Sequence, residues 1–270
     1  MKTPPPVDEH VTHQAQVPAG RDPRFLMLIG LVLVALALGL KSELIAPGQT
    51  WDLGAALVVI AAPALFVYVR VRGKAPALEH FVPAVIAAIA VTGVAVTVPE
   101  TWKYALMTFA YGGFFVITAQ LDSLRLRGLE KPGHVIVQET VQALTLVTAY
   151  LVVIMGTWLS LPMRLGWVFV ISALAAFRSF RVMGKPMSTN RAFLFSIMVG
   201  QVVAFFAWAV SVYVLFNAGT LAVMFLLAWY INRGVIRHTA EETLTRHVAF
   251  EYGAFAAILA FLFFSGYRPH

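Results

Sequence analysis

The stretch VIVQETVQALTLVTAYLVVIMG, which runs from Val135 to Gly156, decides the fold of this chain. It is as long as the roughly 20 apolar residues that an α-helix needs to cross a bilayer. Its first two turns carry Gln138, Glu139 and Gln142, and every residue after Thr148 is apolar. The stretch therefore predicts a membrane-spanning helix with polar side chains near one end.

The composition extends this prediction to the whole chain. Hydrophobic residues make up 60% and charged residues only 12%, whereas a soluble domain has about 25% charged residues. We therefore expect an all-α fold, a polytopic transmembrane helical bundle of nine spans. The nine apolar runs are Phe25–Ala46, Leu53–Val71, Phe81–Val98, Trp102–Leu121, Val135–Gly156, Leu165–Val182, Ala192–Phe216, Thr220–Ile231 and Val248–Ser265.

The positions of Lys and Arg predict the topology. Sixteen of the 20 fall in inner segments when the chain has nine spans and a cytoplasmic N-terminus, as the positive-inside rule requires. The C-terminus is then outside, and we expect the protein in the plasma (inner) membrane of a bacterium. The eighth run is short, and it spans only if its helix continues through Asn232 and Arg233, with the arginine reaching the headgroups.

The domain organisation follows from the same runs. Residues 1–24 contain too few apolar groups to form a core, so they predict a disordered cytoplasmic arm. Residues 25–265 form the transmembrane domain and 266–270 a short outer tail. Glycines at 20, 73, 128, 184 and 234 are spaced by 53, 55, 56 and 50 residues. This spacing indicates either a two-span repeat of about 53 residues or ordinary helix endings in a tightly connected bundle.

Several kinds of chemistry are excluded. The chain has no cysteine, which rules out disulfides and thiolate nucleophiles or ligands. Membrane-embedded prenyltransferases also have nine spans, but they hold magnesium and diphosphate with aspartate-rich stretches, and no two of the four aspartates here are close in sequence. No histidine lies at mid-membrane, so a tetrapyrrole could be bound only at the inner surface. We expect neither a metal nor a cofactor. The basic residues are scattered over loops, which excludes nucleic acid as a partner.

Gln138, Glu139 and Gln142 are the first candidate site, because they share one side of their helix. A carboxyl group within a span is by default a functional candidate. The three predict a proton or cation relay, or a site for a polar headgroup, at the inner mouth of a cavity. Alternatively, Glu139 is stabilised by the positive end of the helix dipole and faces another helix or the headgroups.

The link between the last two runs, residues 233–247, is the second candidate. His238 and Glu242 are four residues apart, as are His247 and Glu251, so each pair lies on one helical face. These residue types can bind a metal or exchange protons, but no metal-binding spacing is present. An apolar stripe at the same interval favours an interfacial amphipathic helix whose charges pair with each other.

These patterns favour a non-catalytic structural, assembly or hydrophobic-ligand-holding membrane component. Its partners would be a bilayer with anionic headgroups and either other membrane subunits or an apolar ligand. The alternative is a secondary transporter in which Glu139 couples protons or cations along a path with Gln142, Gln201 and Arg178, and this path requires the four residues to converge in space. A membrane-embedded lipid-modifying enzyme ranks below both.

Overall fold

A computed structural model describes residues 27–28, 30–35, 37–38, 78–97, 101–126, 129, 131–156, 159–183, 186–213 and 216–266. The predicted cytoplasmic arm and the second apolar run lie outside the described residues. So do residues 267–270 and four of the five glycines that mark the proposed repeat.

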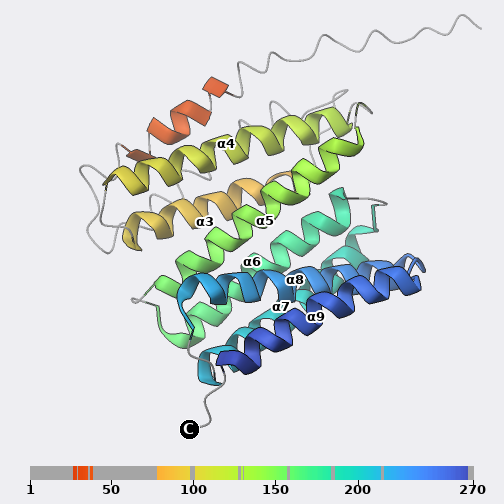
Figure 1. The fold of residues 1–270 in the computed structure, drawn as a ribbon. Coiled ribbons are helices and arrows are strands. Elements are labelled where there is room, and N and C mark those ends of the chain that lie inside the picture. Colours follow the sequence, from red (N-terminus) through yellow and green to blue (C-terminus); the bar gives the residue numbers. More distant parts are fainter. Residues whose placement is uncertain are drawn as a thin grey trace, which may run out of the picture.

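Helices are the only regular structure in the described residues (Figure 1). Residues 27–28, 30–35 and 37–38 are helical. They are followed by the 3₁₀ turn η1 (Leu78–His80), α3 (Val82–Thr97), α4 (Thr101–Leu126), α5 (Pro132–Met155), α6 (Leu161–Val182), α7 (Thr189–Tyr213), α8 (Ala218–Ala240) and α9 (Arg246–Gly266).

Six of these helices, α4 to α9, are long and apolar enough to cross a membrane. They correspond to the fourth to ninth predicted runs. The eighth run does continue as a helix through Asn232, because α8 extends to Ala240. The expectation that Arg233 reaches the headgroups is wrong, since its side chain is only 7% exposed and points into the protein.

Local sequence signals account for the helix ends. α5 and α6 each begin with a proline in the first turn, where the missing N–H costs no hydrogen bond. Asn217 caps α8, its side-chain oxygen accepting a hydrogen bond of 2.8 Å from the backbone N–H of Thr220. α5 stops at Gly156, whose N–H donates to the carbonyl of Val152. Short connections then make successive helices antiparallel (Figure 1).

The predicted amphipathic helix over residues 233–247 is not present as a separate element. The first half of this stretch belongs to α8, which ends at Ala240, and α9 begins at Arg246. Between them Glu242 adopts a φ of 55°, in the left-handed region that interrupts a right-handed helix. His238 and Glu242 therefore do not share one continuous helical face.

Two glycines allow close helix contacts inside the bundle. A methyl group on Gly93 of α3 would overlap Val152 of α5, and one on Gly234 of α8 would overlap the ring of Tyr252 on α9. Small residues let membrane helices approach closely enough to gain van der Waals contact. α5 thus packs against α3, and α9 is held mainly through α8.

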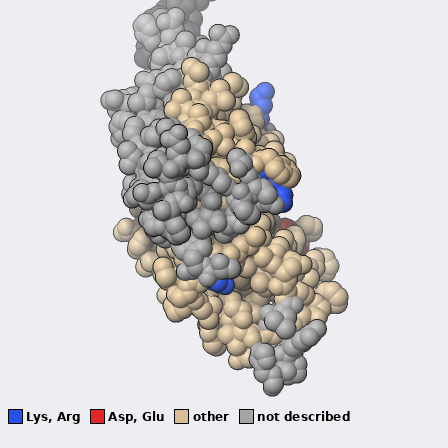
Figure 2. Space-filling view, turned by 90° about the vertical axis from the view of Figure 1, so that its left-hand side faces the viewer, with Lys and Arg blue, Asp and Glu red and all other residues tan. Residues whose placement is uncertain are grey.

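Charge is distributed unevenly over the described bundle. Figure 2 looks onto the left-hand side of Figure 1, where α9 ends, and shows few charged atoms among the described residues. The antiparallel order of α4 to α9 places most of the described cations at the opposite end: Arg125, Lys131, Arg178, Arg181, Arg191, Arg233, Arg237 and Arg246. We refer to this as the basic end; the other end holds Lys103 and Arg164.

Candidate functional site

A buried ion pair at the basic end links four parts of the chain. Oδ1 of Asp122 on α4 accepts hydrogen bonds from Arg178 of α6 at 2.7 Å and from Nε2 of Gln138 of α5 at 2.6 Å. Oδ2 lies 3.0 Å from Nδ1 of His80, which ends η1. All four side chains are buried. We call these residues the Asp122 cluster.

The Asp122 cluster has a structural role, because it joins η1, α4, α5 and α6. Its carboxylate has a cation and two further polar neighbours, which is the condition under which a buried charge is tolerated. The predicted site residues Gln138 and Arg178 therefore do lie close together. They meet as hydrogen-bond donors to Asp122, which was not among the predicted site residues. The predicted fourth span stopped at Leu121, one residue before Asp122, whereas α4 continues to Leu126. A longer helix would have placed the acid within the span.

A second group of polar contacts surrounds Arg233 on α8. One of its guanidinium nitrogens, Nη1, donates to Oγ of Ser179 on α6 at 2.9 Å, and Nη2 lies 3.3 Å from Oε1 of Glu139 on α5. The guanidinium also lies over the rings of Trp229 and Tyr230, with centroid distances of 5.2 and 5.4 Å, a favourable cation–π arrangement. Glu139 is 44% exposed, so it closes this group toward the outside of the protein.

Arg237 and Arg181 extend the polar contacts along the basic end. Arg237 donates to the backbone carbonyls of Ser179 and Met183 and pairs with Glu241 at 3.0 Å. Arg181 pairs with Glu79 at 3.0 Å. Each of these arginines therefore has an acidic partner, as Arg178 and Arg233 do, so ion pairs compensate at least four of the eight described cations at the basic end.

A groove of about 290 Å³ lies beside Arg233 and Glu139. α8 packs against both α5 and α9, and the three helices line the groove. Its residues are Glu139, Thr140, Gln142 and Ala143 of α5, Leu226, Leu227, Trp229, Tyr230 and Arg233 of α8, and Phe255 of α9. Most of this wall is apolar, and its charged groups are Glu139 and Arg233. We call it the α5–α8–α9 groove.

Two polar atoms of residues that line this groove are buried and have no partner among the described residues. One is Nε of Arg233 and the other is Oε1 of Gln142. The amide nitrogen of Gln142 is already used, because it donates to the carbonyl of Ala175 on α6 at 2.9 Å. A buried polar atom without a partner costs about 1–3 kcal/mol. Both atoms are buried behind the wall of the groove, so a molecule in the groove would contact them only if these side chains moved.

The remaining predicted residues do not form one site. His238 contacts Thr243, with 2.9 Å between Nδ1 and Oγ1, and Glu251 accepts a 3.1 Å hydrogen bond from Tyr230. Glu242 and His247 are exposed. Within the described residues no three His, Asp or Glu side chains are placed to hold a metal ion.

The residues of the predicted transport path do not converge. Glu139 and Gln142 line the groove, but Arg178 is bound to Asp122. Gln201 is exposed on α7. Of the four, only the two residues of α5 share a cavity.

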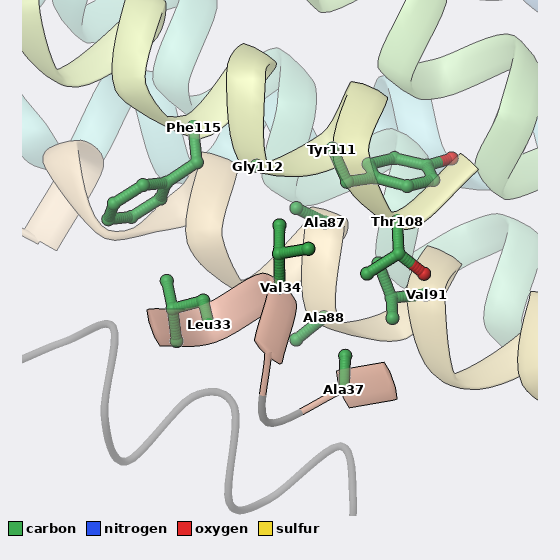
Figure 3. Close-up of a pocket in the computed structure, with 10 residues that line it drawn as sticks. All are labelled: Leu33, Val34, Ala37, Ala87, Ala88, Val91, Thr108, Tyr111, Gly112 and Phe115. Atoms are coloured by element: carbon green, nitrogen blue, oxygen red, sulfur yellow. The ribbon is translucent and has the colours of Figure 1, made fainter. Parts of the chain in front are cut away.

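A smaller cavity lies between α3, α4 and the residues Leu33, Val34 and Ala37 (Figure 3). Its volume is about 40 Å³, and apolar side chains such as Leu33, Val34 and Phe115 line most of it. The hydroxyl of Thr108 is satisfied by the carbonyl of Tyr104 at 2.8 Å. A space this small and apolar is a packing gap, since even one water molecule needs two to four polar partners.

No protein-family model, curated protein or solved structure matches this chain. The choice of function therefore rests on the chain's own residues, and the α5–α8–α9 groove is the feature that combines volume, an apolar wall and an exposed carboxylate.

Proposed function

We propose that this chain is a nine-span integral membrane protein that holds an amphipathic ligand in the α5–α8–α9 groove. The proposed N-terminus is cytoplasmic and the C-terminus is outside, in the plasma (inner) membrane of a bacterium. Six membrane-length helices support the integral membrane location. The concentration of described cations at the basic end supports the orientation, because Lys and Arg collect on the cytoplasmic side and meet anionic headgroups there.

The observation that carries the ligand-holding role is the pairing of apolar wall and polar corner in one groove. Leu226, Leu227 and Phe255 offer apolar contact, whereas the half-exposed carboxylate of Glu139, paired with Arg233, supplies the polar corner. A ligand with an apolar chain and a polar head satisfies both parts. Burying the chain against the wall contributes about 25 cal/mol per Å² of apolar surface.

The size of the groove limits what it encloses. At about 290 Å³, it lies at the lower end of the range of small-molecule pockets, roughly 300–1,000 Å³. It can enclose a headgroup and the adjoining part of a chain, and the rest of an amphiphile would lie along the helices in the bilayer. This arrangement suits a lipid better than a soluble substrate.

The test compares two substitutions at neighbouring positions of α5. Ala143 lines the groove, and Leu144 is exposed, so Ala143→Trp fills the groove whereas Leu144→Trp adds the same ring outside it. Each full-length protein is purified in mild detergent, and the retained amphiphiles are identified by native mass spectrometry. We expect a stoichiometric amphiphile on the wild type and on Leu144→Trp that is lost from Ala143→Trp. Equal retention by the two variants, or none on the wild type, contradicts the proposal.

The same preparations test the transporter alternative, which the contact between Glu139 and Arg233 supports. Glu139 is half-exposed and lies 3.3 Å from Arg233, so a cation from outside the protein would compete with Arg233 for its carboxylate. Ligand holding predicts no proton or cation flux in proteoliposomes. A flux that Glu139→Gln abolishes and that Ala143→Trp leaves unchanged would favour the transporter.

A further inference from the structure

The polar corner of the α5–α8–α9 groove presents a negative charge to the molecule that the groove holds. Glu139 and Arg233 are the charged residues of its wall, but the carboxylate side chain is 44% exposed whereas the arginine is only 7% exposed. The guanidinium donates to Ser179 and lies over the rings of Trp229 and Tyr230. A ligand therefore meets the carboxylate of Glu139 before it meets the cation behind it.

One oxygen of this carboxylate has no partner. Arg233 reaches Oε1 through both of its terminal nitrogens, at 3.4 and 3.3 Å, and no other described group pairs with Oε2 of Glu139. Both distances exceed the 2.7–2.9 Å that is typical of a charge-assisted hydrogen bond between nitrogen and a carboxylate. Glu139 thus keeps an acceptor that Arg233 does not use.

A second carboxylate adds negative charge beside the groove. Glu251 of α9 accepts a 3.1 Å hydrogen bond from the hydroxyl of Tyr230, and this tyrosine lines the groove. Among the described residues that line the groove or bond to its lining, the charged ones are Glu139, Glu251 and Arg233. Two carboxylates therefore face one guanidinium, and a cationic headgroup is the one that complements this charge.

We infer that the ligand of the groove is a membrane lipid whose headgroup ends in a primary ammonium, as in an aminophospholipid. This inference rests on the ligand-holding function proposed above and names the class of amphiphile. A primary ammonium brings a positive charge and three N–H donors, so it pairs with Oε2 of Glu139 while Arg233 keeps Oε1. Such charge-assisted hydrogen bonds are roughly twice as strong as neutral ones.

The place of the polar corner in the bundle suits a lipid headgroup. Glu139 lies in the first third of α5 and Arg233 in the last third of α8, so both are near the basic end. The apolar wall continues along α8 at Leu226 and Leu227, closer to the middle of that helix. A lipid whose ammonium pairs with Glu139 thus has its chains directed along this wall toward the interior of the bilayer.

Other headgroups fit the corner less well. An anionic head would approach the carboxylate of Glu139 and be repelled by it. A hydroxyl can donate to Oε2 but brings no charge to balance the two carboxylates. A trimethylammonium head brings the charge but has no N–H to donate. These three alternatives define the comparison lipids.

The experiment measures four lipids with the same oleoyl chains against the purified full-length protein by native mass spectrometry. Dioleoylphosphatidylethanolamine carries the primary ammonium, and dioleoylphosphatidylcholine has methyl groups in place of its N–H groups. Dioleoylphosphatidic acid lacks the ammonium, and dioleoylglycerol is uncharged. We expect the phosphatidylethanolamine to bind about fivefold more tightly than the phosphatidylcholine, and more tightly than the other two. The factor is this modest because Glu139 is 44% exposed and water screens the pair.

A variant pair assigns the difference to Glu139. In Glu139→Gln the carboxylate is gone, so the preference for phosphatidylethanolamine over phosphatidylcholine should fall to within about twofold. Glu242→Gln makes the same change at an exposed position outside the groove and should keep the fivefold preference. An undiminished preference in Glu139→Gln overturns the inference. If Glu139→Gln fails to fold, the four lipids on the wild type still decide the question.

The outcomes separate this inference from the function beneath it. Equal binding of phosphatidylethanolamine and phosphatidylcholine, or tighter binding of phosphatidic acid or dioleoylglycerol, overturns the ammonium headgroup. The ligand-holding groove still stands in that case if Ala143→Trp abolishes the binding. If no lipid binds the wild type, or if Ala143→Trp binds all four as the wild type does, the ligand-holding function fails as well.

Discussion

Oδ1 of Asp122 lies 2.7 Å from a guanidinium nitrogen of Arg178, and both side chains are 2% exposed. The two residues come from α4 and α6. Asp122→Asn keeps the shape of the acid but removes its charge, so the guanidinium is left buried without a counter-ion. We expect the free energy of unfolding to fall by about 3–5 kcal/mol, measured by detergent-induced unfolding. Glu242→Gln removes an exposed carboxylate and should change stability by less than about 0.5 kcal/mol.

Removing both charges together distinguishes an ion pair from two independent contacts. Asp122→Leu combined with Arg178→Met leaves no uncompensated charge. Its loss of stability should therefore be smaller than the sum of the two single losses, as expected for residues in direct contact. Additive losses would show that the two charges do not depend on each other.

The contact between Gly234 and Tyr252 predicts opposite effects for the same substitution on neighbouring helices. Gly234→Ala places a methyl group into the tyrosine ring and should cost about 1–3 kcal/mol through overpacking. Gly253→Ala has no atom in its way and should be neutral or stabilising by up to about 1 kcal/mol, because alanine favours a helix over glycine. Thermal melting in detergent compares the two, and an equally stable Gly234→Ala protein would contradict the close α8–α9 contact.

Glu139 controls the charge of the polar corner. Glu139→Gln leaves Arg233 without its acidic partner on α5, so we expect the affinity for dioleoylphosphatidic acid to rise about fivefold to tenfold relative to dioleoylglycerol. Because Glu139 is 44% exposed, added salt should reduce the change. Glu242→Gln serves as the control in the same lipid titration, and an unchanged ratio in Glu139→Gln would mean that Glu139 does not balance Arg233.

The absence of cysteine makes the proposed orientation directly measurable. Thr243→Cys and Ser160→Cys place single thiols at exposed positions between helices, at opposite ends of the described bundle. In intact spheroplasts a membrane-impermeant maleimide should label the cysteine at 160, and it should label the one at 243 only after the membrane is opened. The reverse pattern would invert the proposed topology.

Hydropathy predicted the membrane-length helices α4 to α9 because apolar length is a local property of the chain. It also located Glu139 and Gln142, since polar residues inside an apolar run are visible without neighbours. The ion pair between Asp122 and Arg178 could not be predicted in this way, because the two residues lie 56 positions apart in the sequence and meet only in the folded bundle. The helical spacing of His238 and Glu242 was misleading, since four-residue intervals do not reveal that the backbone at Glu242 turns to a positive φ.

The Asp122 cluster also has a consequence for how the protein is made. Asp122 precedes Arg178 by 56 residues, so α4 and α5 are synthesised before the cation that neutralises the acid exists. During that interval, His80 and Gln138 are the cluster members already available as hydrogen-bond partners. Insertion of α6 then brings Arg178 to Asp122 and completes the ion pair. This step fixes α4 and α5 in their final arrangement.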